Sequence, residues 1–252
     1  ADVSGHGVPA ALITMAANEA FSLAIRNSDS PAAVFREVNR QLSEQIKTQD
    51  YLTAFLVRID ERMHITYANA SHQRALHYRK KRNAIETYDT NGLFIGAMAD
   101  ATDTYEEKQS RLEFGDLLLL FTDGITEQVN PAGEEFGHAR LQELIFEHRD
   151  LTAQQIADKI HDALMEFAGD ARIRDDDVVD ELGESGFDVV VVLGEAGIGD
   201  VHLGQADLHV VAAVVEAVDG CAVLFGQGVR FGRAWLHAAA EAVSEGRLEH
   251  VG

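Results

Sequence analysis

The sequence predicts an α+β protein in which helices and strands occupy separate blocks of the chain. Two segments with helical periodicity come first, short strand-like segments follow, and two amphipathic segments come after them. This order favours a meander of strands with helices layered on it over a doubly wound parallel sheet. A chain of 252 residues is long enough to bury a sizeable core in this way.

Two helices are expected at the start of the chain. Residues 9–26 are small and apolar and follow a glycine-rich turn, which is typical of a helix start. Ser30 followed by Pro31 has the pattern of an N-cap and a first helical residue. That pair predicts a second helix that extends to about Lys47.

Strands are expected in the middle of the chain. Three strand-like segments follow the second helix: residues 51–60, 63–70 and 74–79. A hairpin turn at residues 60–62 would pair the first two of them. Residues 112–122 contain the apolar run Leu117–Phe121, which is typical of a strand buried on both faces. Residues 136–148 and 152–168 then have the pattern of amphipathic helices.

The charge of the chain excludes several classes of partner. Its 42 acidic and 21 basic side chains give a net charge of −21, which argues against binding to nucleic acid or to an anionic membrane surface. No apolar run is expected to reach the length of a membrane span. One cysteine, Cys221, excludes an internal disulfide and a thiolate zinc cluster. We expect a cytoplasmic protein, whose carboxylates remain free to bind divalent cations.

The composition changes near residue 178. Residues 178–252 lack Lys, Asn, Thr, Pro, Met and Tyr altogether, yet they hold 12 of the 21 glycines. We therefore divide the chain into a domain at residues 1–178 and an unassigned extension at residues 179–252, which is either specific to this lineage or translated out of frame. Residues 194–199 resemble the start of a phosphate-binding loop, but Asp200 follows where such a loop needs Lys, so nucleotide binding is rejected.

Three acidic sites lie at expected strand ends or tight turns: Asp2, Asp123, and the run from Asp175 to Asp177. Carboxylates that converge from strand ends commonly hold Mg²⁺ or Mn²⁺, which prefer oxygen ligands. Two such ions can activate a bridging water and neutralise a phosphoryl group. Taken singly, each site is more often an ordinary turn or a solvated loop.

Together, and in this order, the motifs are far more specific. Six collinear blocks carry the resemblance: residues 2–12 (DVSGHGVPAAL), 67–72 (YANASH), 92–96 (GLFIG), 114–127 (FGDLLLLFTDGITE), 130–137 (NPAGEEFG) and 176–178 (DDV). They resemble the bacterial PPM-type (type 2C) serine/threonine protein phosphatases, in the branch of the stage II sporulation and stress-response regulators. The resemblance covers about 177 residues.

The resemblance implies a β-sandwich flanked by helices, with two Mn²⁺ or Mg²⁺ ions at one end. Asp2 would bridge the two metals, the carbonyl of Val3 would bind one of them, and Asp123 and Asp176 would complete the carboxylate set. A metal-activated water would then attack a phosphoserine or phosphothreonine directly, without a phosphoenzyme.

Other polar residues of the motifs have less certain roles. His6 is either a general acid or a cap of the glycine-rich turn. Asn69 and His72 are expected to hold a strand turn together and not to contact substrate. Ser71 stands where the family has Gly, and Glu127 either supports the metal site or is a surface acid.

The sequence departs from the family pattern at both ends. The strand that normally precedes Asp2, with its own acidic residue, is missing, so we expect an N-terminally truncated domain with an open sheet edge. After Asp177, residues 179–186 intervene before residues 187–193, which could serve as the last strand. That insertion leaves Asp188 as an alternative to Asp176.

The resemblance also implies partners. The substrate would be a phosphorylated anti-anti-sigma-like regulator, and the full-length parent would carry an upstream sensor or receiver domain. The first two helices would be the natural surface for a switch. The main alternative is a pseudophosphatase of the same fold that binds a partner without turnover, and a hydrolase of small phosphate esters is a third possibility.

Overall fold

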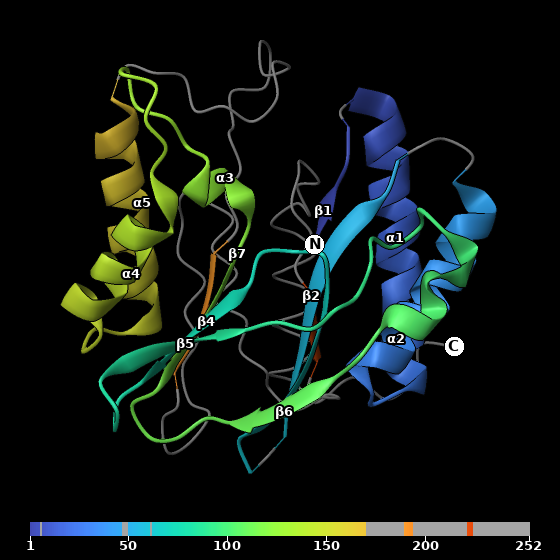
Figure 1. Cartoon of the computed structure of the whole chain (residues 1–252), viewed down its shortest axis with the longest axis horizontal. Helices are drawn as coiled ribbons and strands as arrows, with labels where there is room; N and C mark the ends of the chain where they lie inside the picture. Colours follow the sequence, from blue (N-terminus) through green and yellow to red (C-terminus); the bar gives the residue numbers. More distant parts are fainter. Residues whose placement is uncertain (6, 47–49, 61, 170–188, 194–220, 224–252) are drawn as a thin grey trace, which may run out of the picture.

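Two antiparallel sheets lie face to face in the computed structural model, with helices on both outer sides (Figure 1). The structure describes residues 1–5, 7–46, 50–60, 62–169, 189–193 and 221–223. Among these, one sheet has the order β1-β2-β3-β6, with β9 also paired to β2, and the other has the order β5-β4-β7-β8. The predicted α+β sandwich with flanking helices is confirmed.

The described elements follow one another in this order: β1 (Asp2–Val3), α1 (Gly7–Asn27), α2 (Pro31–Gln45), β2 (Leu52–Ile59), β3 (His64–Ala70), β4 (Ala75–Arg79), β5 (Ala84–Tyr88), the 3-10 helix η1 (Ala99–Thr104), β6 (Lys108–Arg111), β7 (Leu117–Phe121), α3 (Asp123–Thr126), α4 (Gly137–His148), α5 (Ala153–Ala168), β8 (Val189–Leu193) and β9 (Cys221–Val223).

Helices α1 and α2 cover the outer face of the first sheet, and α4 and α5 cover that of the second (Figure 1). The predicted cap of α2 is confirmed, because the Ser30 hydroxyl accepts a hydrogen bond from the Ala33 amide at 3.2 Å. Thr152 caps α5 in the same way and forms a capping box with Gln155. Both helices therefore begin where their local sequence places them.

The alternation of buried side chains in β2 and β7 generates three apolar layers. In β2, Leu56 contributes to the cluster under α1 and α2, whereas Val57 contributes to the cluster between the sheets. In β7, Leu118 contributes to the cluster between the sheets, whereas Leu119 packs in the cluster with α4 and α5. Since both faces of β7 are covered, its uninterrupted apolar run is explained.

The chain passes from one sheet to the other directly after β3. The predicted hairpin is confirmed, with β2 and β3 antiparallel and Ile59 opposite Ile65. The following strand, β4, pairs with β5 and β7 and so belongs to the second sheet. Residues 71–74 therefore connect the two sheets, and this connection forms part of the candidate site.

Two short strands come from the part of the chain with the unusual composition. β8 pairs antiparallel with β7, with Val189 opposite Phe121, which agrees with the final strand expected within residues 187–193. β9 pairs with β2 on the edge that β1 leaves uncovered, with Ala222 opposite Val57. The sheet edge that was expected to be open is thus partly covered. The division of the chain at residue 178 stays a prediction.

Helix α1 is an exception to the expectation that no apolar run reaches the length of a membrane span. Val8–Asn27 has a mean hydropathy of 1.5 and is long enough to cross a bilayer, by length and composition only. One face of this helix is nevertheless buried at Ala17 and Phe21, within the cluster that includes α2. The opposite face leaves Leu12 and Met15 exposed at 61% and 64%. A core helix with one such covered face passes the same hydropathy test.

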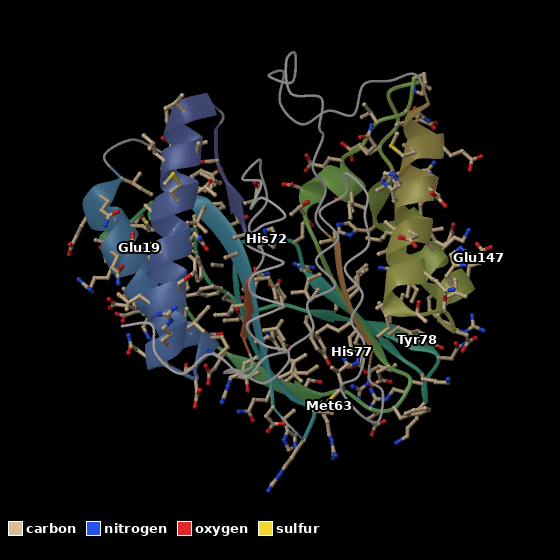
Figure 2. The ribbon with its side chains drawn as sticks, turned by 180° about the vertical axis from the view of Figure 1, so that it is seen from behind. Glu19, Met63, His72, His77, Tyr78 and Glu147 are labelled. Atoms are coloured by element: carbon tan, nitrogen blue, oxygen red, sulfur yellow. The ribbon has the colours of Figure 1, made fainter. Side chains whose placement is uncertain are left out.

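A buried polar network lies on the inner face of β4. The His77 imidazole is fully buried, with Nδ1 at 2.5 Å from the Tyr88 hydroxyl and Nε2 at 3.2 Å from the Asp116 carboxylate. Burial, followed by the charge of Arg79, lowers the pKa of His77. The next residue, Tyr78, packs edge-on against a ring of α4 instead, and Figure 2 labels both side chains. Asp116 therefore acts as a buried acceptor that connects β4 to the residues just before β7.

Candidate active site

A polar pocket of about 260 Å³ lies where the two sheets and α3 meet, and its lining residues are Thr53, Ser71, His72, Gln73, Arg74, Asp123 and His138. Four of these residues belong to the connection between β3 and β4, and two come from the starts of α3 and α4. The pocket therefore gathers side chains from distant parts of the sequence, and Asp123 is among them.

Asp123 is the first residue of α3 and is separated from the end of the buried strand β7 by Thr122 alone. The rigid strand fixes its backbone, and its carbonyl accepts the Glu127 amide at 2.8 Å to close the single turn of α3. Its side chain is half-buried in the pocket wall. The structure thus places Asp123 at the pocket, while its role as a metal ligand stays a prediction.

Asp2 lies beside the same pocket. In the pairing of β1 with β2, Asp2 stands opposite Thr53 and Val3 stands opposite Leu52. Directly opposite residues of an antiparallel pair project from the same face, with Cβ atoms about 4.5–5.5 Å apart. Because Thr53 lines the pocket, the Asp2 side chain projects on the pocket side of the sheet.

The turn after Asp2 is held by hydrogen bonds and by glycine. The Ser4 amide donates to the Tyr51 carbonyl at 2.8 Å, and the Tyr51 amide donates to the Ser4 hydroxyl at the same distance. Gly5 has a φ of +84°, which supports the predicted sharp turn into α1. A Cβ there would also lie 3.3 Å from the Asp50 carboxylate.

Asn69 holds the turn that carries His72, as the sequence predicts. Its side-chain oxygen accepts the His72 amide at 2.8 Å, and its side-chain nitrogen donates to the His72 carbonyl at 3.0 Å. The same nitrogen donates to Asp89 at 2.8 Å. The buried side-chain amide of Asn69 therefore hydrogen-bonds to both the amide and the carbonyl of His72.

Ser71 adopts a left-handed backbone conformation, with a φ of +56°, at the position where the family has Gly. That conformation costs a non-glycine residue roughly 1–2 kcal/mol. The Ser71 hydroxyl donates to the Gly92 carbonyl at 2.9 Å, which offsets part of the cost. The turn is thus preserved despite the departure from the family pattern.

Ser71→Gly should be more stable than Ser71→Ala by about 0.5–1 kcal/mol, although both changes remove the hydroxyl. Only glycine removes the cost of the left-handed conformation, which is roughly 1–2 kcal/mol. Its greater conformational freedom in the unfolded chain lowers stability by roughly 0.5–1 kcal/mol and so offsets about half of that gain. Urea unfolding of the two variants measures the difference. An alanine variant as stable as the glycine variant would show that the turn relaxes out of this conformation.

His72 does more than the sequence predicts. Its Nδ1 atom lies 2.8 Å from the Thr53 hydroxyl, and its Nε2 atom is buried without a hydrogen-bond partner among the described residues. Burial holds the pKa of His72 well below its usual value. Figure 2 shows His72 toward the end of the sandwich that carries β1 and α3. The imidazole is therefore neutral and lines the pocket.

Four lining residues were missed by sequence reasoning: Thr53, Gln73, Arg74 and His138. Thr53 is a lone hydroxyl in an apolar strand, Arg74 lies two residues after His72, and His138 is the second residue of α4. Arg74 pairs with Asp89, its Nε atom being 2.9 Å from the carboxylate. The pocket forms from contacts between distant segments, which leave no local pattern in the sequence. The one available signal for Arg74 was its position two residues after His72.

The acidic side chains near α3 repel one another. Burial, then Asp123 and then Glu135, raise the pKa of Glu127 above its usual value. A cation bound at Asp123 would relieve this repulsion. Glu127 itself is exposed, so the alternative that it is a surface acid next to the site agrees with its position.

The described donors suit part of a divalent metal site. Asp2, the Val3 carbonyl and Asp123 all supply oxygen, the ligand type that Mn²⁺ and Mg²⁺ prefer. Within the ranges that the structure describes, no three His, Cys, Asp or Glu side chains come together to hold an ion. Asp176 and its alternative Asp188 lie outside these ranges, as do Asp175, Asp177 and His6.

Comparison with known proteins identifies the family. The family model described as stage II sporulation protein E (SpoIIE) matches residues 1–179. The chain belongs to the SpoIIE family. This SpoIIE-family chain is 31% identical over 177 residues to phosphoserine phosphatase RsbU of Bacillus subtilis, covering 70% of this chain and 52% of RsbU. It is 30% identical over 166 residues to phosphoserine phosphatase RsbP of the same organism, covering 63% and 38%.

A solved structure supports the fold of this SpoIIE-family chain. The SiaA-PP2C domain of Pseudomonas aeruginosa has a TM-score of 0.59 and 26% sequence identity, and the match covers 69% of each chain. The PPM phosphatase-like architecture predicted from the motifs is therefore confirmed. The chain spans about half the length of RsbU and less of RsbP, so it corresponds to part of each relative.

Proposed function

We propose that this chain is a metal-dependent protein serine/threonine phosphatase. The observation that carries the proposal is the pocket that Asp123 and Thr53 both line, with Asp2 paired opposite Thr53 in the sheet. These are the residues onto which the family resemblance places metal ligands. The names of RsbU and RsbP, both phosphoserine phosphatases, support the same reaction for this chain.

Mn²⁺ or Mg²⁺ would be held by Asp2, the Val3 carbonyl, Asp123 and Asp176. When bound, the metal supplies an activated water and neutralises charge on the phosphoryl group. The residues of the chain position these groups: β7 fixes Asp123, and pairing with β2 fixes Asp2. The protein's share of catalysis is thus positioning and electrostatic stabilisation.

The proposed substrate is a phosphoserine or phosphothreonine on a regulatory protein of the anti-anti-sigma type. The open, polar pocket beside the Asp123 carboxylate suits a phosphorylated side chain that is presented on a protein surface. A cytoplasmic location and a sensor or receiver domain in the full-length parent belong to the same proposal. Both rest on the family resemblance.

A non-catalytic binding module of the same fold is the second candidate. The observation in its favour is that the pocket offers a cationic and a neutral polar side chain, Arg74 and His72, which could hold a phosphoryl group without a metal. A module of this kind would bind a phosphorylated partner in the pocket without hydrolysing it.

Phosphate release from a serine phosphopeptide tests the proposal. Incubation with Mn²⁺ should release inorganic phosphate, EDTA should stop the release, and added Mn²⁺ should restore it. A folded chain that binds the phosphopeptide and Mn²⁺ but releases no phosphate would favour the binding module.

A further inference from the structure

We propose that the β3–β4 connection binds the phosphoryl group of the substrate, through His72 at the base of the pocket and Arg74 at its rim. The inference rests on the proposed function, because it assigns substrate contacts within the same pocket. It gives this connection, which crosses between the two sheets, a role in recognition as well as in the fold.

The orphaned nitrogen of His72 is the first support. Nε2 is buried and meets no hydrogen-bond partner in the described part of the chain. A buried polar atom without a partner costs about 1–3 kcal/mol, so such atoms are uncommon unless a ligand or water satisfies them. His72 and Asp123 line the same pocket, and we infer that a ligand bound in that pocket would be the partner of Nε2.

The turn does not require the imidazole. Asn69 holds the backbone of His72 at both the amide and the carbonyl. The ring contributes one hydrogen bond of its own, to Thr53. The second ring nitrogen, Nε2, has no hydrogen-bond partner among the described residues.

The Thr53 hydroxyl can set the tautomer that phosphate needs. When Thr53 donates to Nδ1, the neutral ring carries its proton on Nε2 and can donate it. A phosphate dianion offers only acceptor oxygens, so it would select this tautomer. The neutral state of the buried ring is compatible with this arrangement, since one proton is sufficient.

Arg74 is the second support. Its side chain is 66% exposed at the rim of the pocket, and Asp89 engages only the Nε edge. Among described residues, the two Nη groups have no acceptor, and a guanidinium offers its remaining N–H groups in a planar fork that suits phosphate oxygens. Asp89 is held in turn by Asn69, so the guanidinium is anchored to the same turn as His72.

Local positive charge is needed because the chain as a whole is strongly acidic. A net charge of −21 repels a phosphorylated protein at long range. The Lys108 ammonium donates to the main-chain carbonyl of Asp89 at 2.7 Å, so two cationic side chains, Arg74 and Lys108, contact Asp89. The pocket mouth is thus a suitable place for a dianion to approach.

Inorganic phosphate is the probe for the test. Calorimetric titration of the chain with phosphate in the presence of Mg²⁺ should show binding that weakens roughly 10- to 100-fold in Arg74→Ala, because a charge-assisted hydrogen bond is lost. Arg74→Lys should retain part of the affinity. The matched control is Arg82→Ala, since Arg82 is an exposed arginine that pairs with Glu86 away from the pocket, and it should leave phosphate affinity unchanged.

His72 is tested with two variants. His72→Phe should weaken phosphate binding and raise KM for a serine phosphopeptide more than it lowers kcat. His72→Gln, whose amide nitrogen can reach the place of Nε2, should recover part of both losses. In wild-type chain labelled with ¹⁵N-histidine, His72 should show a protonated Nε2 whose signal shifts when phosphate is added, a change that a structural role would not produce.

The outcomes separate this inference from the proposed function. The inference would be overturned if Arg74→Ala and the folded His72 variants all bind phosphate as tightly as the wild type. It would also be overturned if Arg82→Ala loses as much phosphate affinity as Arg74→Ala. Both results would hold even if the chain is an active phosphatase. Absence of phosphate binding by the wild-type chain would overturn it as well. Arg74-dependent binding without any phosphopeptide hydrolysis would support the inference and contradict the proposed function.

Discussion

Asp123→Ala should lower kcat/KM for a serine phosphopeptide by about 10³-fold or more while the protein remains folded. The family resemblance makes Asp123 a metal ligand, and a bound metal contributes several kcal/mol of charge stabilisation in the transition state. At about 1.4 kcal/mol for each tenfold change in rate, loss of that term gives a fall of this size. The side chain is half-buried at the pocket wall, so the fold should tolerate its removal.

The measurement is phosphate release in the presence of Mn²⁺, with thermal unfolding as the check on folding. Asp162→Ala provides a matched control, because Asp162 is an exposed aspartate on α5, remote in the fold from the pocket. It should retain wild-type activity. Activity of Asp123→Ala within tenfold of the wild type would show that Asp123 is not a ligand of the catalytic metal.

Asp116→Ala should lower the free energy of unfolding by about 3–5 kcal/mol, which is typical when one partner of a buried ion pair is removed. Asp116 is 1% exposed and accepts the amides of Lys80 at 2.9 Å and Glu113 at 3.0 Å. It also lies 3.2 Å from His77 and 3.4 Å from Arg79. Removal of the carboxylate takes this acceptor from the two backbone amides and from the buried His77, and leaves Arg79 with the Arg111 carbonyl and Glu86.

Urea unfolding measures this loss. Asp116→Asn keeps one acceptor oxygen and should be intermediate between the wild type and Asp116→Ala. Asp162→Ala, on the exposed side of α5, should change the unfolding free energy by less than about 0.5 kcal/mol. A loss under about 1 kcal/mol for Asp116→Ala would mean that the network between the sheets contributes little to stability.

Elements with strong local signals could be predicted from the sequence. The five apolar residues Leu117–Phe121 form β7 over the same range, because both of its faces are buried. The Ser30-Pro31 pair starts α2, because an N-cap hydroxyl and a proline both act within the first helical turn. Such signals act locally, so they do not depend on the tertiary fold.

Other elements lack a local signal. β5 and β6 are short, and β6 (Lys108–Arg111) is polar throughout, because it lies at a sheet edge and pairs through its backbone. α3 has only four residues, and its Asp-Gly sequence is more typical of a turn. The apolar character of α1 was predicted, but hydropathy alone does not reveal that only one face of this helix is buried.

The candidate site could be predicted only in part. Asp2 and Asp123 stand in motifs, so the family resemblance is sufficient to identify them. The direction of the His72 side chain and the approach of Thr53 depend on strand register and on the hydrogen bonds of Asn69 to His72. Arg74 is a candidate only because the β3–β4 connection lines the pocket. Contacts between distant segments have no signature in one sequence.

Calorimetric titration of the chain with Mn²⁺ is the most direct test of a metal site at Asp2 and Asp123. The wild-type chain should bind about two ions. Asp2→Asn and Asp123→Asn should each bind fewer ions or bind them more weakly. The control variant Asp162→Asn should match the wild type. A wild-type chain that binds no Mn²⁺, or Asp2 and Asp123 variants that bind it as tightly as the wild type, would contradict the site.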